Sequence, residues 1–293
     1  MNRVLIIGAA SAVGRQVLSQ LPAASVPPRA LVRNPPTAPL PPDVEIVRGD
    51  LTLPETLNAA LDRIDSVFLI WTAPPATVAP ALERIARHAR RIVFLSSPYN
   101  NPHPFFQGGQ PNPIAALHSA IERLIESSNL EWTFLRPGMF AANALRWWAP
   151  MIRAGAGVVR WPYPDAPTAP IDERDIAAAA VRALCEDGHA AAEYVLTGPE
   201  SLTQGEQLSV IGDVIGRPLR MEEMSPEDTR AEWLAHMPAF VIDFLLGAWA
   251  AAMGRPALVT STVADITGTP ARTFRDWAMN HAPEFQTASR EPA

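Results

Sequence analysis

The amino-acid sequence predicts an α/β protein with a doubly wound parallel sheet and a smaller, mostly helical C-terminal lobe. In the first half, short apolar segments alternate with segments that carry apolar residues three and four positions apart. A glycine-containing turn follows the first apolar segment, as in Rossmann-type folds. With 48% hydrophobic and 18% charged residues, the chain has ample apolar surface for a sizeable core.

Six strands are expected in the first half, because six short runs are rich in Val, Ile, Leu or Phe and are bounded by turn residues. The expected strands are residues 4–7, 29–32, 44–47, 66–70, 92–95 and 132–135, and the expected helices between them are residues 13–21, 53–61, 79–88 and 114–127. Strands that alternate with helices indicate a parallel sheet covered on both faces.

The pattern changes after Asn143. Aromatic residues, glycines and prolines between positions 147 and 163 indicate an irregular stretch that could form a lid or a pocket wall. Asp172 is expected to cap a helix over residues 173–186, and residues 194–197 form a strand that could rejoin the sheet. Further helix starts are expected at Thr203 with Glu206, which form a capping box, at Ser225-Pro226 and at Thr269-Pro270.

Composition excludes several classes of function. The net charge of -6 provides no basic surface for nucleic acid, and no lysine occurs, which removes Schiff-base and P-loop lysine chemistry. Cys185 is the only cysteine, and the six histidines are scattered, so no metal site is expected. The apolar segment 238–253 is too short to span a membrane and contains Asp243, so a core or groove helix is expected there. Residues 3–12 imitate a short signal peptide, but a strand and turn explain them better, so a cytoplasmic protein is expected.

The sharpest motif runs from Gly8 to Gly14, between the first strand and the first helix. Gly8 permits the tight turn, Gly14 permits close packing of helix on strand, and the N–H groups of the first helical turn can bind a pyrophosphate. Ser11 replaces the middle glycine of the usual G-x-x-G-x-x-G spacing, so a strand, loop and helix with chance glycines is the alternative.

Arg33 ends the second strand, where folds that prefer NAD usually place Asp or Glu. A guanidinium there can bind a 2'-phosphate, which favours NADP(H) over NAD(H). A solvated loop arginine is the alternative. Asp50, after the third strand, is placed to meet the adenine, although a helix-capping Asp would look the same.

Several further segments make the chain resemble the NmrA-like branch of the atypical short-chain dehydrogenase/reductases, a family with triphenylmethane reductases and similar to ergot-alkaloid dehydrogenases. The segments are His-Ser-Ala-Ile-Glu at 118–122, Trp-Thr-Phe-Leu-Arg-Pro-Gly-Met-Phe at 132–140, Pro-Ile-Asp-Glu-Arg-Asp-Ile-Ala at 170–177, Tyr-Val-Leu-Thr-Gly-Pro at 194–199, and the tail at 263–277. The likeness spans nearly the whole chain.

The resemblance implies a set of cofactor-binding residues. Around the phosphates and adenosine these are Gly8, Ala10, Ser11, Ala12, Val13, Gly14, Arg33, Asp50, Leu51, Trp71, Thr72 and Ala73; around the nicotinamide they are Ser96, Ser97, His118, Pro137, Gly138, Met139 and Phe140. Apart from His118, which lies within the expected helix 114–127, these residues follow predicted strands or begin a helix at the carboxyl edge of the sheet, where open α/β sheets bind ligands.

The usual Tyr-x-x-x-Lys dyad of the wider superfamily is missing, because Ile114 and His118 stand at its two positions when Glu122 is aligned with the family acid. A ketone reductase needs that acid, whereas a cationic or conjugated acceptor tolerates its loss. Tyr99 and His118 are the candidate proton donors, with a surface-loop role and a structural or ribose-binding role as the respective alternatives. Tyr99, Phe140, Asn143, Trp161 and Tyr163 are the candidate substrate contacts, although the aromatics suit the core equally well.

The expected domains are a nucleotide-binding domain over residues 1–145, rejoined by 170–198, a substrate lobe over 146–169 and 199–285, and a tail over 286–293. The expected function is an NADPH-dependent oxidoreductase for a small or medium apolar acceptor of the iminium, quinone, dye or enone type. The alternative is a sensor that binds NADP(H) without turnover and reports to a protein partner; an epimerase or dehydratase is weaker, because it needs the absent dyad. No nucleic-acid or membrane partner is expected. Segment 238–253 could be core, a subunit interface or the lining of an access channel, which leaves a homodimer open.

Overall fold

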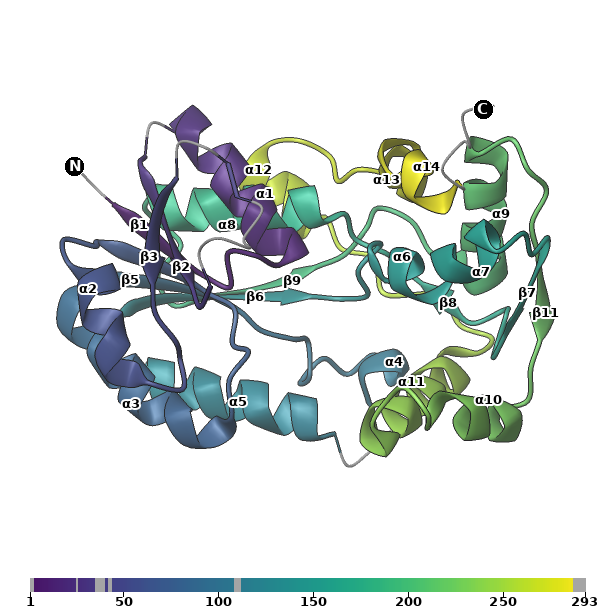
Figure 1. The fold of residues 1–293 in the computed structure, drawn as a ribbon, viewed down its shortest axis with the longest axis horizontal. Coiled ribbons are helices and arrows are strands. Elements are labelled where there is room, and N and C mark those ends of the chain that lie inside the picture. Colours follow the sequence, from purple (N-terminus) through teal and green to yellow (C-terminus); the bar gives the residue numbers. More distant parts are fainter. Residues whose placement is uncertain (1–2, 25, 35–39, 42–43, 108–111, 287–293) are drawn as a thin grey trace.

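The computed structural model describes residues 3–24, 26–34, 40–41, 44–107 and 112–286. Its centre is a seven-stranded parallel sheet of order β3-β2-β1-β4-β5-β6-β9 (Figure 1). The strands are β1 (Val4–Ile7), β2 (Pro28–Val32), β3 (Glu45–Arg48), β4 (Ser66–Leu69), β5 (Arg91–Leu95), β6 (Glu131–Pro137) and β9 (Ala192–Leu196). All six strands predicted for the first half are present. The strand predicted at 194–197 is β9, which rejoins the sheet beside β6.

Helices cover both faces of the sheet, which explains why β1, β2, β4 and β5 are continuous runs of buried residues. On one face lie α1 (Ala12–Gln20), α8 (Glu173–Cys185) and α12 (Thr262–Thr267); on the other lie α2 (Leu57–Leu61), α3 (Val78–His88) and α5 (Pro113–Glu126) (Figure 1). Short 3-10 helices are η1 (Leu21–Ala24), η3 (Pro54–Thr56) and η4 (Pro75–Thr77). The strand order reverses between β1 and β4, so a crevice is expected at their carboxyl ends.

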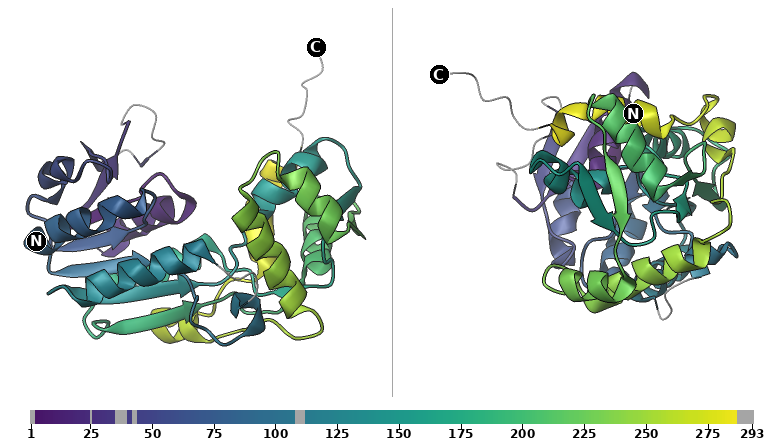
Figure 2. Two further views of the ribbon diagram at one scale, coloured as in Figure 1. Left: turned by 90° about the horizontal axis from the view of Figure 1, so that it is seen from below. Right: turned by 90° about the vertical axis from the view of Figure 1, so that its right-hand side faces the viewer.

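The rest of the chain forms a helical lobe beside the sheet, as the left view of Figure 2 shows. Its helices are α4 (Pro104–Gln107), α6 (Asn143–Trp147), α7 (Ala149–Arg153), α9 (Gln204–Val214), α10 (Pro226–Trp233), α11 (Ala239–Ala252), α13 (Phe274–Asn280) and α14 (Ala282–Phe285). Its strand pairs are β7 (Val158–Trp161) with β11 (Arg220–Glu223), and β8 (Pro167–Thr168) with β10 (Leu202–Thr203). Buried aromatic side chains, among them Trp148, Trp249 and Trp277, form its core.

Predicted helix caps agree with the structure at three positions. Asp172 accepts a hydrogen bond from the Arg174 N–H, Thr203 and Glu206 form a capping box, and Ser225 caps α10. The prediction of a helix start at Thr269-Pro270 is wrong.

The helix in this region is α13, which starts after Thr273. The Thr273 side chain forms a capping box with Asp276. The backbone N–H of Arg272 donates to the Asp175 carboxylate at 2.7 Å, and the Arg272 side chain pairs with the same carboxylate. This tertiary contact holds residues 270–273 outside the helix.

Two other regions differ from expectation. The stretch predicted to be irregular after Asn143 contains the short helices α6 and α7 and the strand β7. Helix α12, assigned from sequence to the substrate lobe, packs against α8 and β9 of the sheet, where Val263 is buried.

Helix α11 fits the expectation of a core or groove helix, because Ile242, Trp249 and other residues of one face are buried.

Three of the segments that cross between sheet and lobe, residues 138–141, 169–171 and 196–198, lie side by side. We call them the neck. Backbone hydrogen bonds join them: Gly138 N–H to Leu196 at 2.9 Å, Ile171 N–H to Met139 at 2.8 Å and Gly198 N–H to Ala169 at 3.2 Å. A Cβ at Gly198 would lie 2.2 Å from the Pro170 carbonyl oxygen, so only glycine permits this approach. None of the described helices combines the length and apolar character that crossing a membrane requires.

Candidate active site

Two cavities open at the carboxyl edge of the sheet. One, of about 370 Å³, lies at the ends of β1, β2 and β3 and is lined by the glycine turn. The other, of about 470 Å³, lies at the ends of β5 and β6 and extends to α5, α6 and α11. The sheet therefore holds one side of both cavities, and the lobe completes the second.

The glycine turn in the first cavity cannot accept larger residues. Gly8 has φ +89°, and a Cβ there would lie 2.7 Å from Ile70 Cβ. A Cβ at Gly14 would lie 2.3 Å from the Gly8 carbonyl oxygen, so α1 packs directly on the turn. Ser11 caps α1 by accepting a hydrogen bond from the Gly14 N–H at 3.0 Å. This close-packed turn and helix start, residues 8–14, which we call the cradle, fits a dinucleotide pyrophosphate at the helix N-terminus.

Arg33 and Asp50 lie on the same cavity wall. The Arg33 side chain is exposed and has no hydrogen bond or ion pair with any residue that the structure describes. Asp50 accepts a hydrogen bond from the Thr52 N–H at 2.8 Å, and this bond, with a smaller contribution from the Arg33 charge, lowers the pKa of Asp50. The wall thus offers an ionised carboxylate and an available guanidinium.

Most of the predicted cofactor residues of this region line the first cavity. They are Gly8, Ala10, Ser11, Arg33, Asp50, Leu51, Thr72 and Ala73. Ala12, Val13, Gly14 and Trp71 do not line it. Val13 is 2% exposed and Gly14 is buried behind the turn, while the Trp71 indole donates to the Ala73 carbonyl at 2.7 Å. These residues support the cradle.

The predicted nicotinamide-side residues line the second cavity. They are Ser96, Ser97, His118, Pro137, Gly138, Met139 and Phe140, together with Tyr99 and Asn143. Ser96 is 5% exposed, and its hydroxyl has no hydrogen-bond partner among the residues that the structure describes. An orphaned buried hydroxyl at the end of β5 fits a polar ligand group in the cavity.

His118 projects from α5 into the second cavity beside Ser97, and its Nδ1 lies 2.7 Å from the Ser97 hydroxyl oxygen. Its ring also meets Phe94 edge to face. Burial lowers the pKa of His118, against a smaller opposing effect of the Glu122 carboxylate. The imidazole is therefore neutral near pH 7, suited to accepting or donating one hydrogen bond but poor as a proton source.

Tyr99 lines the cavity, but its hydroxyl is engaged elsewhere. It donates to Glu122 Oε2 at 2.5 Å, and the same carboxylate accepts two hydrogen bonds from Arg136, at 3.0 Å to Oε1 and 2.7 Å to Oε2. Burial, followed by the bond to Glu122, raises the pKa of Tyr99. Arg136 also pairs with Glu193. Tyr99 is therefore anchored to a buried ion pair.

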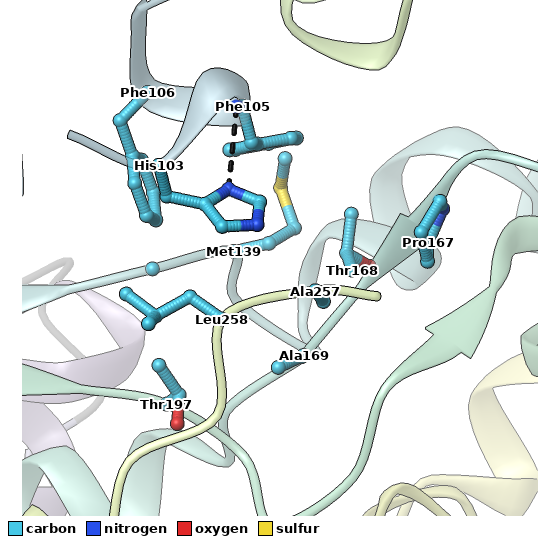
Figure 3. A pocket seen from close by; sticks show the side chains of 11 residues that line it. His103, Phe105, Phe106, Met139, Pro167, Thr168, Ala169, Thr197, Ala257 and Leu258 are labelled. Atoms are coloured by element: carbon cyan, nitrogen blue, oxygen red, sulfur yellow. Dashed lines mark hydrogen bonds between the residues drawn. The ribbon is translucent and has the colours of Figure 1, made fainter. Parts of the chain in front are cut away.

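Three further residues do not line the second cavity. His103 lines an adjoining small pocket with Phe106 and Met139, and its Nδ1 accepts a hydrogen bond from the Phe105 N–H at 3.3 Å (Figure 3). Trp161 is 4% exposed, and its indole donates to Gln204 at 2.8 Å within the lobe core. Tyr163 packs against the same core. Trp161 and Tyr163 were predicted substrate contacts, and neither reaches the cavity.

The lobe contributes further lining residues, most of which the sequence did not single out. They are Phe105, Phe106, Arg146, Trp147, Met237, Pro238, Val241, Phe244 and Leu245. Trp147 belonged to the predicted pocket-wall stretch, and residues 238–245 belonged to the apolar segment left as core, interface or channel lining. The apolar run of α11 was the available signal, but an apolar helix does not show from its sequence which element each of its sides faces.

Among the described residues, no group of three His, Cys, Asp or Glu side chains could hold a metal ion. The sheet order, the glycine turn and the first cavity, which lies where the strand order reverses, define a dinucleotide-binding protein. The second cavity adds a largely apolar pocket beside the cofactor position.

Comparisons with known proteins agree with this class. The model of a family described as NAD(P)H-binding matches residues 8–187. A Streptomyces griseus protein named (4-alkanoyl-5-oxo-2,5-dihydrofuran-3-yl)methyl phosphate reductase is 38% identical over 96% of this chain and 99% of its own. An NAD(P)H azoreductase of Xenophilus azovorans is 33% identical over 97% of this chain and 100% of its own.

Solved structures share the fold. A Citrobacter triphenylmethane reductase complexed with NADP(H) superposes with a TM-score of 0.77 at 20% identity, covering 95% of this chain and 99% of that one. The chain belongs to the NAD(P)H-binding family, and its relatives include an Aspergillus flavus protein named as an NmrA-like family domain-containing oxidoreductase, in line with the predicted resemblance. The chain is an NAD(P)H-dependent oxidoreductase.

Proposed function

We propose that the protein is an NADPH-dependent reductase that passes hydride to a small or medium apolar organic acceptor, of the quinone, azo or other dye, iminium or enone type. The observation that carries this proposal is the second cavity, which adjoins the predicted nicotinamide residues and is walled mainly by apolar side chains of the lobe. The two relatives above are named a reductase of a dihydrofuranyl phosphate and an azoreductase, which supports the choice of acceptors.

The first cavity supports the cofactor side of the proposal. The cradle of Gly8 and Gly14 would hold the pyrophosphate, and Leu51 with Asp50 would border the adenine. When bound, NADPH supplies the hydride. Ser96 and Gly138, at the ends of β5 and β6, would border the nicotinamide end.

Arg33 supports the preference for NADPH over NADH. Its guanidinium is exposed on the cavity wall and can donate two parallel hydrogen bonds to a 2'-phosphate. Asp50 is the acid on that wall, and its carboxylate is already held by the Thr52 N–H. Arg33→Gln should therefore weaken NADPH binding by about ten- to one-hundred-fold and leave NADH binding unchanged.

The residues around the acceptor favour a reaction that needs no strong acid from the protein. Ile114 and His118, which align with the positions of the Tyr-x-x-x-Lys dyad, both line the second cavity. Ile114 has no proton to give, His118 is neutral, and the Tyr99 hydroxyl is held by Glu122. We infer that Ser97 and His118 orient the cofactor and acceptor through the Nδ1–hydroxyl pair, while water protonates the product.

The test combines binding and turnover. Tryptophan fluorescence is suited to the binding step, because Trp147 lines the cavity. Titrations with NADPH, NADP, NADH and NAD should give the tightest binding for the 2'-phosphorylated pair. Loss of NADPH absorbance is then followed with menadione, methyl red, crystal violet and chalcone, and acceptor-dependent oxidation is expected with at least one.

The alternative function, a sensor that binds NADP(H) without turnover, is the outcome if NADPH binds and no acceptor in a broad panel is reduced. That outcome would refute the reductase proposal and direct the search to a protein partner. A closed or polar second pocket would have favoured the sensor, and the largely apolar lining favours the reductase.

A further inference from the structure

Arg146 is the single charged side chain among the described residues that line the second cavity, where neither Asp nor Glu is present. It lies on α6, three residues after Asn143 and directly before Trp147, and all three side chains line the same cavity. The fold therefore directs one face of a short helix, with one positive charge, toward an otherwise mainly apolar pocket.

The guanidinium of Arg146 is not used by the protein. It is exposed and makes no hydrogen bond, ion pair or aromatic contact with any residue within the described ranges. This distinguishes it from Arg136, whose charge is neutralised by Glu122 and Glu193. An uncompensated charge beside apolar walls attracts an anion, and the guanidinium fork matches a carboxylate, sulfonate or phosphate.

The position of Arg146 gives the ligand a direction. The sheet side of the cavity carries Ser96, Ser97 and Gly138, where the cofactor would deliver hydride, whereas α6 belongs to the lobe side. A ligand that spans the cavity would thus place its reacting group at the sheet and a substituent at the lobe. Asn143 lies on the same helix face, and its side-chain amide donates to the Met139 sulfur at 2.9 Å.

We propose that Arg146 is the anion-recognition residue of the acceptor site, so that the natural acceptor is an apolar conjugated molecule bearing an anionic substituent. This inference rests on the proposed function for the identity of the cavity as the acceptor site. The alternative is that Arg146 is a solvated surface arginine that contributes nothing to ligand binding.

The test measures binding without turnover. Calorimetry of the NADPH-loaded protein compares 2-naphthoate with 2-naphthamide, which have nearly the same shape and differ in charge. The wild type should bind the anion about ten-fold more tightly than the amide. Arg146→Gln should remove this preference by weakening naphthoate alone, whereas the control Arg160→Gln, which removes an exposed arginine of β7 outside the cavity, should keep it.

Equal affinity for the two ligands in the wild type, failure of both to bind, or an unchanged preference in Arg146→Gln would overturn the proposal. Turnover is measured separately with methyl red and its uncharged methyl ester. If naphthoate binding depends on Arg146 while neither dye nor any other acceptor is reduced, the anion site stands and the proposed reductase function fails. If both functions hold, Arg146→Gln raises KM for methyl red and leaves kcat and the KM of the ester nearly unchanged.

Discussion

Replacing Glu122 by Gln tests the buried ion pair that anchors Tyr99 beside the candidate active site. The Glu122 side chain is 2% exposed and that of Arg136 is 4% exposed, and their two hydrogen bonds are 3.0 and 2.7 Å long. A glutamine presents one oxygen where the carboxylate presents two, and its amide N–H groups face the guanidinium donors. Arg136 would then remain charged, with Glu193 as its remaining acidic partner.

The expected cost follows from this geometry. Breaking one partner of a buried ion pair costs about 3–5 kcal/mol, because the other charge stays desolvated. Glu193 keeps part of the charge of Arg136 neutralised, so we expect the lower end, about 3 kcal/mol. For a chain of this size that corresponds to a fall in the melting temperature of roughly 6–12 °C.

The assay is thermal unfolding followed by circular dichroism, with Glu131→Gln as the matched control. Glu131 is likewise paired with arginine, in its case Arg90 and Arg91, but its side chain is 39% exposed. The free energy of unfolding of the control should therefore fall by less than about 1 kcal/mol. In ultraviolet titration, Glu122→Gln should also lower the pKa of Tyr99, since that carboxylate contributes to its elevation. Equal melting temperatures for the two variants would refute the argument that burial makes the Glu122 pair the stronger one.

Three further outcomes are expected. Gly14→Ala places a Cβ 2.3 Å from the Gly8 carbonyl oxygen, so it should cost about 1–3 kcal/mol in thermal unfolding and weaken NADPH binding in fluorescence titration; unaltered binding would contradict the cradle. Tyr99→Phe should keep kcat within a few-fold of the wild type, because its hydroxyl is held by the carboxylate at 2.5 Å; loss of turnover would identify Tyr99 as the proton donor. A hydrogen bond to Glu173 raises the pKa of His281, so its stabilising charge is fully present below pH 6.5 and is lost as pH rises through the elevated pKa. The melting temperature of the wild type should therefore decrease from pH 6 to pH 9, and that of His281→Gln should change less. The same pH dependence of the melting temperature in both proteins would contradict this contribution.

The sheet was predictable because its signals are local. Strand β1 begins and ends where the run Val-Leu-Ile-Ile does, and the cap at Asp172 marks the start of α8. The helix start at Thr273 was missed in favour of Thr269, since both are threonines with a plausible following residue. The choice between them depends on the Asp175 carboxylate, which is distant in sequence, and no local pattern contains that contact.

The candidate site divides in the same way. Residues at strand ends, such as Ser97 and Gly138, were predictable because the topology brings these ends to one edge. The choice between pocket and core was left open for Trp161, because an aromatic residue in a loop-like stretch gives the same sequence pattern in both places; in the structure it is 4% exposed in the lobe core. Arg146 was missed because the sequence does not show which arginines lack an acidic partner. That becomes visible only when the structure places the acidic side chains around the cavity.

The neck described above limits how the two parts of the molecule can move. A lobe attached by one flexible linker swings open as a rigid body, whereas here the crossing segments are joined by backbone hydrogen bonds at Gly138, Ile171 and Gly198. Opening the site by a large rotation would break that ladder, so exchange of acceptor and product is expected to proceed through side-chain motion and small shifts of α11. The amide protons of the neck should accordingly be among the slowest to exchange with deuterium, and the sheet and lobe should unfold together in one transition.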